Sequence, residues 1–246
     1  MMSEFKPGQV ITTQLYSEIL QREVTLSVYL PEDYSDLYKS KVVLCFDGRD
    51  FLRFGQIHRV YERLRRDHAV ERVIIVGFHY ENVEKRRTEF HPQGEKAANT
   101  VRAVAQEVLP WIDETFPTYR VGNARLLLGD SLAGSIALLT ALSYPRVMSQ
   151  VVMLSPHYDE VVESLFQRCQ FKNDLTIWHV VGKEEIDFEL PTSGERADFL
   201  TPNRALSRLI ASTSATYHYE ELDGGHNWKT WKKELPALLK YFLSNQ

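Results

Sequence analysis

The run Leu126-Leu127-Leu128-Gly129-Asp130-Ser131-Leu132-Ala133-Gly134 decides which fold this chain is expected to adopt. Its three leucines are typical of a strand that is buried on both faces of a sheet. Ser131 follows almost at once, with small residues on either side of it, and bulky neighbours would collide across a tight turn. The pattern predicts a buried strand that turns sharply through Ser131 into a helix. We expect the Ser131 hydroxyl to stand at the carboxyl edge of a sheet, beside a helix N-terminus that favours negative charge.

A tight turn of this kind is how α/β-hydrolases present a nucleophile, usually in the pattern G-x-S-x-G. This chain has Ala133 where the second glycine of that pattern stands, and Gly134 follows it. Alanine is small enough to keep the close crossing of strand and helix. The alternative is an ordinary strand-to-helix turn, because glycine eases any tight connection. The two interpretations differ in whether Ser131 has a histidine partner.

Strand-like and helix-like segments alternate along the rest of the chain, which is typical of a mainly parallel sheet. Expected strands are 10–19 and 23–30 (a hairpin), 42–46, 73–78, 125–129, 151–154, 175–181 and 217–222. Expected helices are 56–68, about 96–116 with a bend or break at Pro110, 131–144, 201–212 and 228–243. A polar loop is expected after Phe78, and 184–196 reads as an exposed excursion. The sequence therefore predicts one α/β-hydrolase domain over 1–246, with an N-terminal antiparallel hairpin and helices on both faces of the sheet.

Composition excludes several classes of function. With 43% hydrophobic and 25% charged residues, the chain resembles an ordinary soluble globule, and its formal charge of −4 gives no general attraction to nucleic acid or anionic membranes. No secretory signal or membrane span is visible, so we expect a cytoplasmic protein. Cys45 and Cys169 form no metal or redox motif, and no phosphate-binding loop is present. We therefore predict no metal and no cofactor.

A serine hydroxyl needs a base within hydrogen-bond reach, and histidine suits that role because its pKa lies near neutrality. Chemistry in open α/β sheets gathers beyond the carboxyl ends of the strands. His226 follows the last expected strand and two glycines, so it is the best candidate for the base. A carboxylate should follow the preceding strand, where Glu184, Glu185 and Asp187 all qualify. Glu185 is preferred, with Asp187 as the alternative.

An oxyanion hole needs two backbone N–H groups. We assign one to Leu132, directly after the nucleophile, and the other to Arg49, in the loop after the first buried strand. Side chains at other strand ends are candidates to line a substrate cleft, although packing would explain each of them as well: His157, Trp228, His79 and Glu89. The remaining histidines that we consider bystanders are His58, His68 and His218.

Four stretches of this sequence together resemble the esterase D and enterochelin-esterase-like branch of the α/β-hydrolases. Phe46-Asp47-Gly48-Arg49-Asp50 is similar to its L-D-G-x-x element, and Arg87-Thr88-Glu89-Phe90 to its R-x-x-E-aromatic stretch. The run from Gly129 to Gly134 resembles its nucleophile turn. The run Gly224-Gly225-His226-Asn227-Trp228-Lys229-Thr230-Trp231 resembles its G-G-H-x-W-x-x-W ending, which is the most specific of the four.

The resemblance implies ester hydrolysis without metal or cofactor, with Ser131 as nucleophile, His226 as base and Glu185 as acid. Members of this branch cleave siderophore trilactones, S-formylglutathione and feruloyl or acetyl sugar esters, and some transfer acyl chains. The chain departs from the branch at Ala133 and in having an acidic cluster instead of a single clear acid. The letters Gly129-Asp130-Ser131-Leu132 also spell the GDSL hydrolase signature, but here four strands precede the serine. That second reading offers Asp223 as a rival acid.

These observations lead to the hypothesis of a serine carboxylesterase that acts on a small-molecule ester through an acyl-enzyme. Two alternatives stay open: a pseudo-hydrolase that binds a ligand without turnover, and an acyltransferase that uses the same three residues. The sequence identifies neither the acyl and leaving groups nor the oligomeric state.

Overall fold

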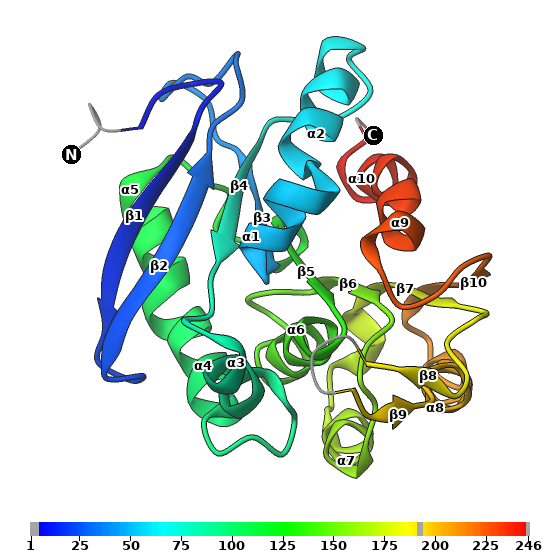
Figure 1. The fold of residues 1–246 in the computed structure, drawn as a ribbon. Helices are drawn as coiled ribbons and strands as arrows, with labels where there is room; N and C mark the ends of the chain where they lie inside the picture. The colour runs from blue at the N-terminus through cyan, green and yellow to red at the C-terminus, as the bar shows by residue number, and fades with distance from the viewer. Residues whose placement is uncertain (1–4, 191–193, 245–246) are drawn as a thin grey trace.

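A central sheet of eight strands organises the computed structural model, which describes residues 5–190 and 194–244 (Figure 1). The strands lie in the order β1-β2-β4-β3-β5-β6-β7-β10. Their bounds are β1 Val10–Ser17, β2 Arg22–Tyr29, β3 Lys41–Phe46, β4 Val73–Phe78, β5 Arg125–Asp130, β6 Gln150–Leu154, β7 Thr176–Gly182 and β10 Thr216–Leu222. A separate two-stranded sheet pairs β8, Phe188–Glu189, with β9, Arg196–Ala197.

The N-terminal hairpin is antiparallel, and the rest of the sheet from β4 onwards is parallel. Val10 pairs with Tyr29 and Ser17 with Arg22, and β2 runs antiparallel to β4. The strands β4, β3, β5, β6, β7 and β10 pair in parallel. The mainly parallel sheet with an antiparallel N-terminal hairpin is thereby confirmed. All the parallel strands end at one edge, which is where the loops that carry the candidate residues begin.

Helices cover both faces of the sheet, as Figure 1 shows. Their bounds are α1 Gly48–Asp50, α2 Ile57–Arg66, α3 Val83–Phe90, α4 Ala97–Ala103, α5 Leu109–Thr115, α6 Leu132–Ser143, α7 Glu160–Arg168, α8 Leu200–Ala211, α9 Trp228–Trp231 and α10 Leu235–Leu243. One buried core joins one face of the sheet to α3–α8. A second core joins the other face to α2, α9, α10 and the turn after α1. Because both faces are covered, β3, β4 and β5 are apolar and buried along nearly their whole length.

The structure differs from the sequence predictions in several segments. The expected polar loop after Phe78 contains α3, whose N-cap Asn82 accepts a hydrogen bond from the Lys85 amide. A helix that the sequence analysis did not identify, α7, begins after the N-cap Asp159. The expected long helix is divided by a π-helical turn at Val104–Val108, before Pro110, which lies in the first turn of α5. The expected excursion 184–196 carries β8 and the start of β9, and its residues 191–193 lie outside the described ones.

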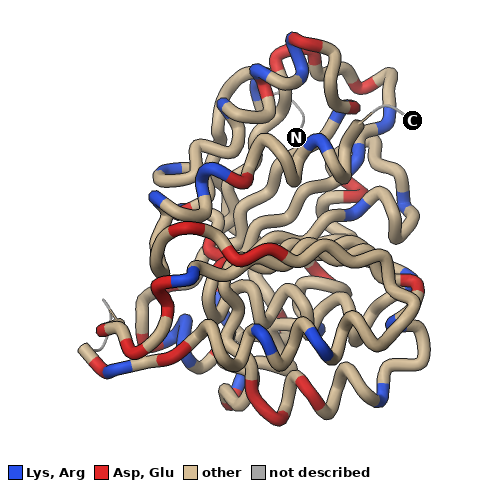
Figure 2. Tube along the Cα trace, turned by 90° about the vertical axis from the view of Figure 1, so that its right-hand side faces the viewer, with Lys and Arg blue, Asp and Glu red and all other residues tan. Residues whose placement is uncertain are grey.

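Charged residues are spread over the molecule. Figure 2 shows Lys and Arg interspersed with Asp and Glu along the described chain in that view. Among the helices that the structure describes, none is both long enough and apolar enough to cross a membrane.

Candidate active site

The turn from β5 into α6 holds Ser131 in an unusual backbone conformation. Its φ of 54° and ψ of −126° lie outside the regions that non-glycine residues favour. The Ser131 amide donates to the Leu154 carbonyl oxygen at 2.9 Å, which fixes the turn against β6. A Cβ atom at Gly129 would lie 2.0 Å from the Ala133 carbonyl oxygen, so no larger residue fits there. Strand and helix therefore cross closely with alanine at position 133, because the space is needed at Gly129.

Glu185 and His226 form a buried hydrogen-bonded pair at the same edge of the sheet. Oε2 of Glu185 lies 2.7 Å from Nδ1 of His226. Oε1 of Glu185 accepts from the Gly182 amide at 2.8 Å and from the Ser155 hydroxyl at 2.6 Å. The Glu185 side chain is fully buried and that of His226 is 6% exposed. A carboxylate with these partners holds the ring in one orientation and directs Nε2 away from itself.

Three aromatic rings surround the imidazole of His226. The ring of Phe188 is stacked on it at 5.3 Å between centroids, Phe199 lies at 4.4 Å and Trp231 at 4.9 Å. Nε1 of Trp231 donates to the Ser155 hydroxyl at 2.9 Å, which joins α9 to the same hydrogen-bond network. The rings exclude water from the Glu185–His226 pair and so strengthen the electrostatic interaction between them.

Ser131 and His226 follow strands that are not neighbours in the sheet. β5 and β10 lie three strand spacings apart, about 14 Å, so a hydrogen bond between the two side chains requires the loop before α9 to reach back across the edge of the sheet. A chain of hydrogen bonds connects the two residues. The Ser131 amide donates to Leu154. The residue after Leu154 is Ser155, whose hydroxyl donates to Glu185, and Glu185 bonds to His226. Within the described residues, no hydrogen bond joins the Ser131 hydroxyl to Nε2 of His226. Within the same residues, Nε2 of His226 makes no hydrogen bond.

Two backbone amides near Ser131 are free to donate. Leu132 is the first residue of α6 and Arg49 lies in α1, and within residues 5–190 and 194–244 neither amide donates to another residue. The loop before α1 is held close to β4 by two glycines. A Cβ atom at Gly48 would lie 2.2 Å from the Gly77 Cα, so the two backbones approach without side chains between them. This close contact places the Arg49 amide at the end of β3, one strand from Ser131.

A buried group of charges lies beneath these two loops. Arg86 on α3 donates through Nε to Asp47, at 2.8 Å from Oδ2, and its Nη2 forms an ion pair with the same carboxylate. Burial raises the pKa of Asp47, while the Arg86 guanidinium opposes that rise. Burial, with the Asp47 carboxylate as a second cause, raises the pKa of Asp130 well above its ordinary value. Burial therefore opposes ionisation of Asp130, which is next to Ser131.

The other candidate acids lie at the surface and pair with cations. Asp187 is exposed and accepts from Nε of Arg196 at 2.8 Å. Asp223 is exposed and bonds to Nζ of Lys183 at 2.7 Å. Glu184 is also exposed. Of the acidic residues that the sequence analysis considered, Glu185 is the one that the fold brings to His226.

The candidate lining residues have different environments. Glu89 is buried in a bidentate ion pair with Arg22 on β2, at 2.8 and 2.6 Å. His79 is buried with Nε2 2.7 Å from the Ser27 hydroxyl, and burial, assisted by the Arg49 charge, lowers its pKa to about 4. Trp228 packs edge-on against Phe51 at 4.8 Å.

His157 is the lining candidate that the fold attaches to the Ser131 turn. Its amide donates to the Ser131 carbonyl oxygen at 3.3 Å. Its ring lies 6.1 Å from that of Phe199, which also contacts His226. Burial lowers the pKa of His157, and the nearby His91 lowers it further.

Sequence reasoning missed the residues that support the Glu185–His226 pair. Ser155 follows β6, which would have marked it as a strand-end residue, and its φ of 50° has no sequence signal. Trp231 belongs to the run after His226, but its bond to Ser155 depends on how α9 packs. Phe188 and Phe199 lie in and after the excursion, where neither periodicity nor spacing assigns a partner.

Comparison with known proteins identifies relatives over nearly the whole chain. The sequence profile of the family described as "Putative esterase" matches residues 17–242. A protein of Bacillus subtilis (strain 168), "Uncharacterized protein YjcH", is 39% identical over 239 residues, covering 97% of this chain and 99% of the relative.

Solved structures share the fold at low sequence identity. The enterobactin esterase FES from Shigella flexneri, solved in the presence of enterobactin, has a TM-score of 0.79 and 19% identity. The match covers 96% of this chain, but the chain spans only 59% of the length of that esterase. The BES protein from Bacillus cereus has a TM-score of 0.78 at 17% identity, with 98% of this chain and 97% of that chain covered. A ferulic acid esterase has a TM-score of 0.74 at 15% identity, with 96% and 97% covered.

Proposed function

The chain belongs to this esterase family, and we propose that within it the protein is a serine carboxylesterase that uses Ser131, His226 and Glu185. The observation that carries the proposal is the buried hydrogen bond of 2.7 Å between Glu185 and Nδ1 of His226. A carboxylate there leaves Nε2 without a proton in the neutral ring, so that nitrogen is able to accept one. The strained turn at Ser131 supports the same assignment, because backbone strain of this kind gathers at functional sites.

In the proposed reaction, the Ser131 oxygen attacks the ester carbonyl carbon while its proton passes to Nε2 of His226. The carbonyl oxygen becomes an oxyanion, and the amides of Leu132 and Arg49 donate to it. The tetrahedral intermediate collapses, the carbon–oxygen bond to the alcohol breaks, and His226 returns the proton to the leaving alcohol. A water molecule then attacks the acyl-enzyme by the same route and releases the acid.

Glu185 would keep its negative charge throughout this cycle and stabilise the imidazolium that forms at each step. Its bonds from Gly182 and Ser155 hold the charge in place without competing for the oxygen that faces His226. The hydrogen bond between Ser131 and His226 is expected to form in the substrate complex, since such contacts often tighten only when substrate binds.

Turnover of aryl esters tests the proposal. Wild-type protein should hydrolyse short-chain p-nitrophenyl esters, and an aromatic-acyl ester such as methyl ferulate extends the panel in line with the named substrates of two structural neighbours. Ser131→Ala should lower kcat by about a millionfold if the three residues act as a unit. Ser143→Ala, on the exposed end of the same helix, is the matched control and should keep wild-type turnover.

Two results would contradict the proposal. Unchanged turnover in Ser131→Ala would show that another group carries the chemistry. Tight binding of an ester without any burst of alcohol release would favour a non-catalytic binding protein. Transfer of the acyl group to an added acceptor alcohol in preference to water would instead identify an acyltransferase built on the same residues.

A further inference from the structure

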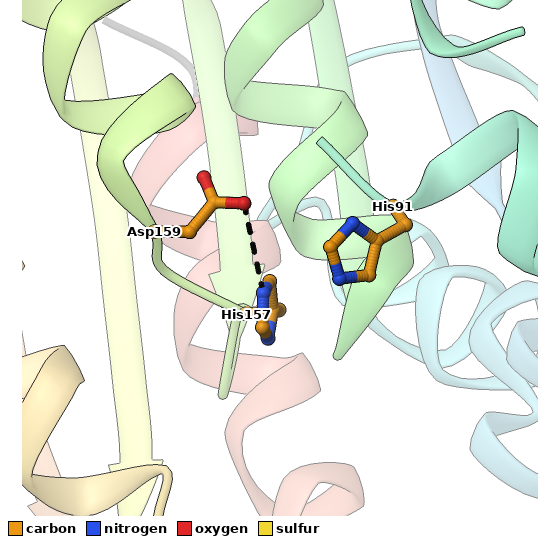
Figure 3. Close-up of side chains that lie close together, drawn as sticks. All are labelled: His91, His157 and Asp159. Atoms are coloured by element: carbon orange, nitrogen blue, oxygen red, sulfur yellow. Dashed lines mark ion pairs between the residues drawn. The ribbon is translucent and has the colours of Figure 1, made fainter. Parts of the chain in front are cut away.

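Two imidazoles and one carboxylate converge beside the Ser131 turn, in an arrangement that the proposed esterase reaction does not use. They belong to His91, His157 and Asp159, and one ligand atom from each lies within 4.8 Å of the others. Figure 3 shows the three side chains facing a common space, with His91 coming from one segment and the other two from the loop after β6. We propose that this cluster binds one divalent transition-metal ion of the Zn²⁺ type.

The chemistry of the three side chains fits such an ion. Two imidazole nitrogens and one carboxylate oxygen are the donors that Zn²⁺ and its neighbours in the first transition series prefer, whereas Mg²⁺ and Ca²⁺ prefer oxygen alone. Three protein ligands leave one tetrahedral position for water or another ligand atom. The rings of His91 and His157 lie 4.6 Å apart between centroids, and Nε2 of His157 lies 3.8 Å from Oδ2 of Asp159. These separations exceed hydrogen-bond length, so small side-chain rotations toward a shared ion are needed.

The backbone around each ligand is held by its own contacts. His157 donates its amide to Ser131, and its carbonyl oxygen accepts from the Ser135 hydroxyl at 2.6 Å. Asp159 is the N-cap of α7, where Oδ1 accepts from two amides and leaves Oδ2 toward the histidines. His91 follows α3, and the turn after it closes at Gly94. A side chain does not fit at this position, because a Cβ atom there would lie 2.4 Å from the Thr88 carbonyl oxygen. Fixed backbones reduce the entropy lost when the ion is bound.

Gln93 is the hydrogen-bond partner that competes with an ion for the ligand atoms of this cluster. Within the described residues, neither ring nitrogen of His157 makes a hydrogen bond. Nδ1 of His91 accepts from the Gln93 amide at 3.1 Å, which places the ring proton on Nε2. An ion bound at Nε2 would move that proton to Nδ1 and release the Gln93 amide to solvent. Gln93 also donates to Oδ2 of Asp159 at 3.2 Å, a bond that the ion would replace.

Metal titration of the intact protein tests the proposal without reference to ester turnover. The protein is dialysed against a chelator, returned to chelator-free buffer and titrated with Zn²⁺ by calorimetry, and separately with Co²⁺ by visible absorption. We expect one ion per chain in both titrations. The Co²⁺ complex should show the intense absorption between 500 and 700 nm that is typical of four-coordinate Co²⁺.

Variants of the three ligands locate the site. His91→Gln and Asp159→Asn should each raise the dissociation constant for Zn²⁺ at least tenfold, a change on the scale that metal-site substitutions produce. Asparagine is as good an N-cap as aspartate, so Asp159→Asn keeps the start of α7 while removing the charge. The matched control is His68→Gln, an exposed histidine outside the cluster, which should bind as wild type does.

Circular dichroism of each variant confirms that it is folded, and His157→Gln serves as a third variant. Three outcomes would overturn the proposal: no binding of either ion by wild type at 100 µM, binding that the cluster variants leave unchanged, or an equal loss in His68→Gln. None of these outcomes bears on the Ser131 assignment, which the ester assay tests separately.

Discussion

His226 and His157 both follow strands at the carboxyl edge of the sheet, and both contact Phe199, yet their surroundings differ. His226 bonds to Glu185 at 2.7 Å, whereas Nε2 of His157 lies 3.8 Å from Asp159. The side chain of His226 is 6% exposed and that of His157 is 31% exposed. Every oxygen of Glu185 is used inside the fold, whereas Asp159 divides its oxygens between a helix cap and Gln93.

The difference separates two uses of the same residue types. A carboxylate that is buried and fully hydrogen-bonded fixes the orientation and tautomer of its histidine, as proton transfer requires. His157 is partly exposed and lies beyond hydrogen-bond length from its carboxylate, so within the described residues its ring nitrogens stay available for a ligand.

Replacing Glu185 with Gln should break the His226 environment most severely. The amide keeps the shape of the side chain but no longer favours the proton on Nδ1, and it cannot stabilise an imidazolium. We expect kcat for an aryl ester to fall about ten-thousandfold, as for the equivalent change in other triads. Steady-state kinetics measures this, with unfolding in urea as a check on the fold. If kcat falls by less than about tenfold, Glu185 is not the acid of the mechanism, because substitutions outside the reacting residues produce losses of that size.

Two further histidines are buried without a carboxylate partner. They should make the free energy of unfolding fall as the pH is lowered. Burial lowers the pKa of His79 and of His179 to about 4, against an ordinary value of 6.5. The unfolded chain therefore binds protons first as the pH falls, and stability that is complete above pH 7 is lost between about pH 6.5 and 4. Each histidine should lower the free energy of unfolding by about 2 kcal/mol between pH 8 and pH 5.

Urea unfolding at the two pH values measures that loss. The variant His79→Gln should show about 2 kcal/mol less pH dependence than wild type, because one of the two groups no longer titrates. The exposed variant His68→Gln is the control. Equal pH dependence in His79→Gln and wild type would contradict the assignment of His79 as a buried neutral group.

Removing the Ser155 hydroxyl should weaken the hydrogen-bond network that holds Glu185 against His226. Ser155→Ala deletes one bond to Glu185 and leaves the buried Nε1 of Trp231 without its acceptor. We expect a loss of about 1–3 kcal/mol in the free energy of unfolding, with kcat reduced on the order of tenfold. Thermal melting and ester kinetics together measure the two effects. Wild-type values for both would show that the network around Glu185 is redundant.

Substitutions of the surface carboxylates should have the smallest effect on kcat. Asp187→Asn and Asp223→Asn each remove a charge from an exposed pair with Arg196 or Lys183. Exposed ion pairs contribute little, so we expect kcat to stay within about twofold of wild type. A loss comparable to that of Glu185→Gln in either variant would move the acid to that position.

Much of the sheet was predictable from the sequence because buried strands are continuous apolar runs with clear ends. The runs 42–46, 73–78 and 151–154 contain no polar residue that would interrupt the apolar pattern. The helix α3 was not predictable by the same reasoning, since Val83–Phe90 is mostly charged and buries only its last two residues. Its function in the fold comes from Arg86 and Glu89, which pair with residues far away in the chain.

The candidate site divides in the same way. Ser131, His226 and Glu185 each follow a strand, so strand order alone predicts that they lie at one edge of the sheet. The support of Ser155 and Trp231 depends on how α9 packs, and the cluster of His91, His157 and Asp159 depends on where α3 ends relative to β6. No spacing in the sequence carries that information, so sequence reasoning could not group these three residues.

Reaction with a fluorophosphonate followed by peptide mass mapping tests most directly whether Ser131 is an activated nucleophile. A serine activated by a histidine attacks the phosphorus and keeps the phosphonyl group, while an ordinary surface serine does not react. We expect one phosphonyl group per chain, located on Ser131, with labelling lost in His226→Ala. An unlabelled chain, or label on any other serine, would contradict it.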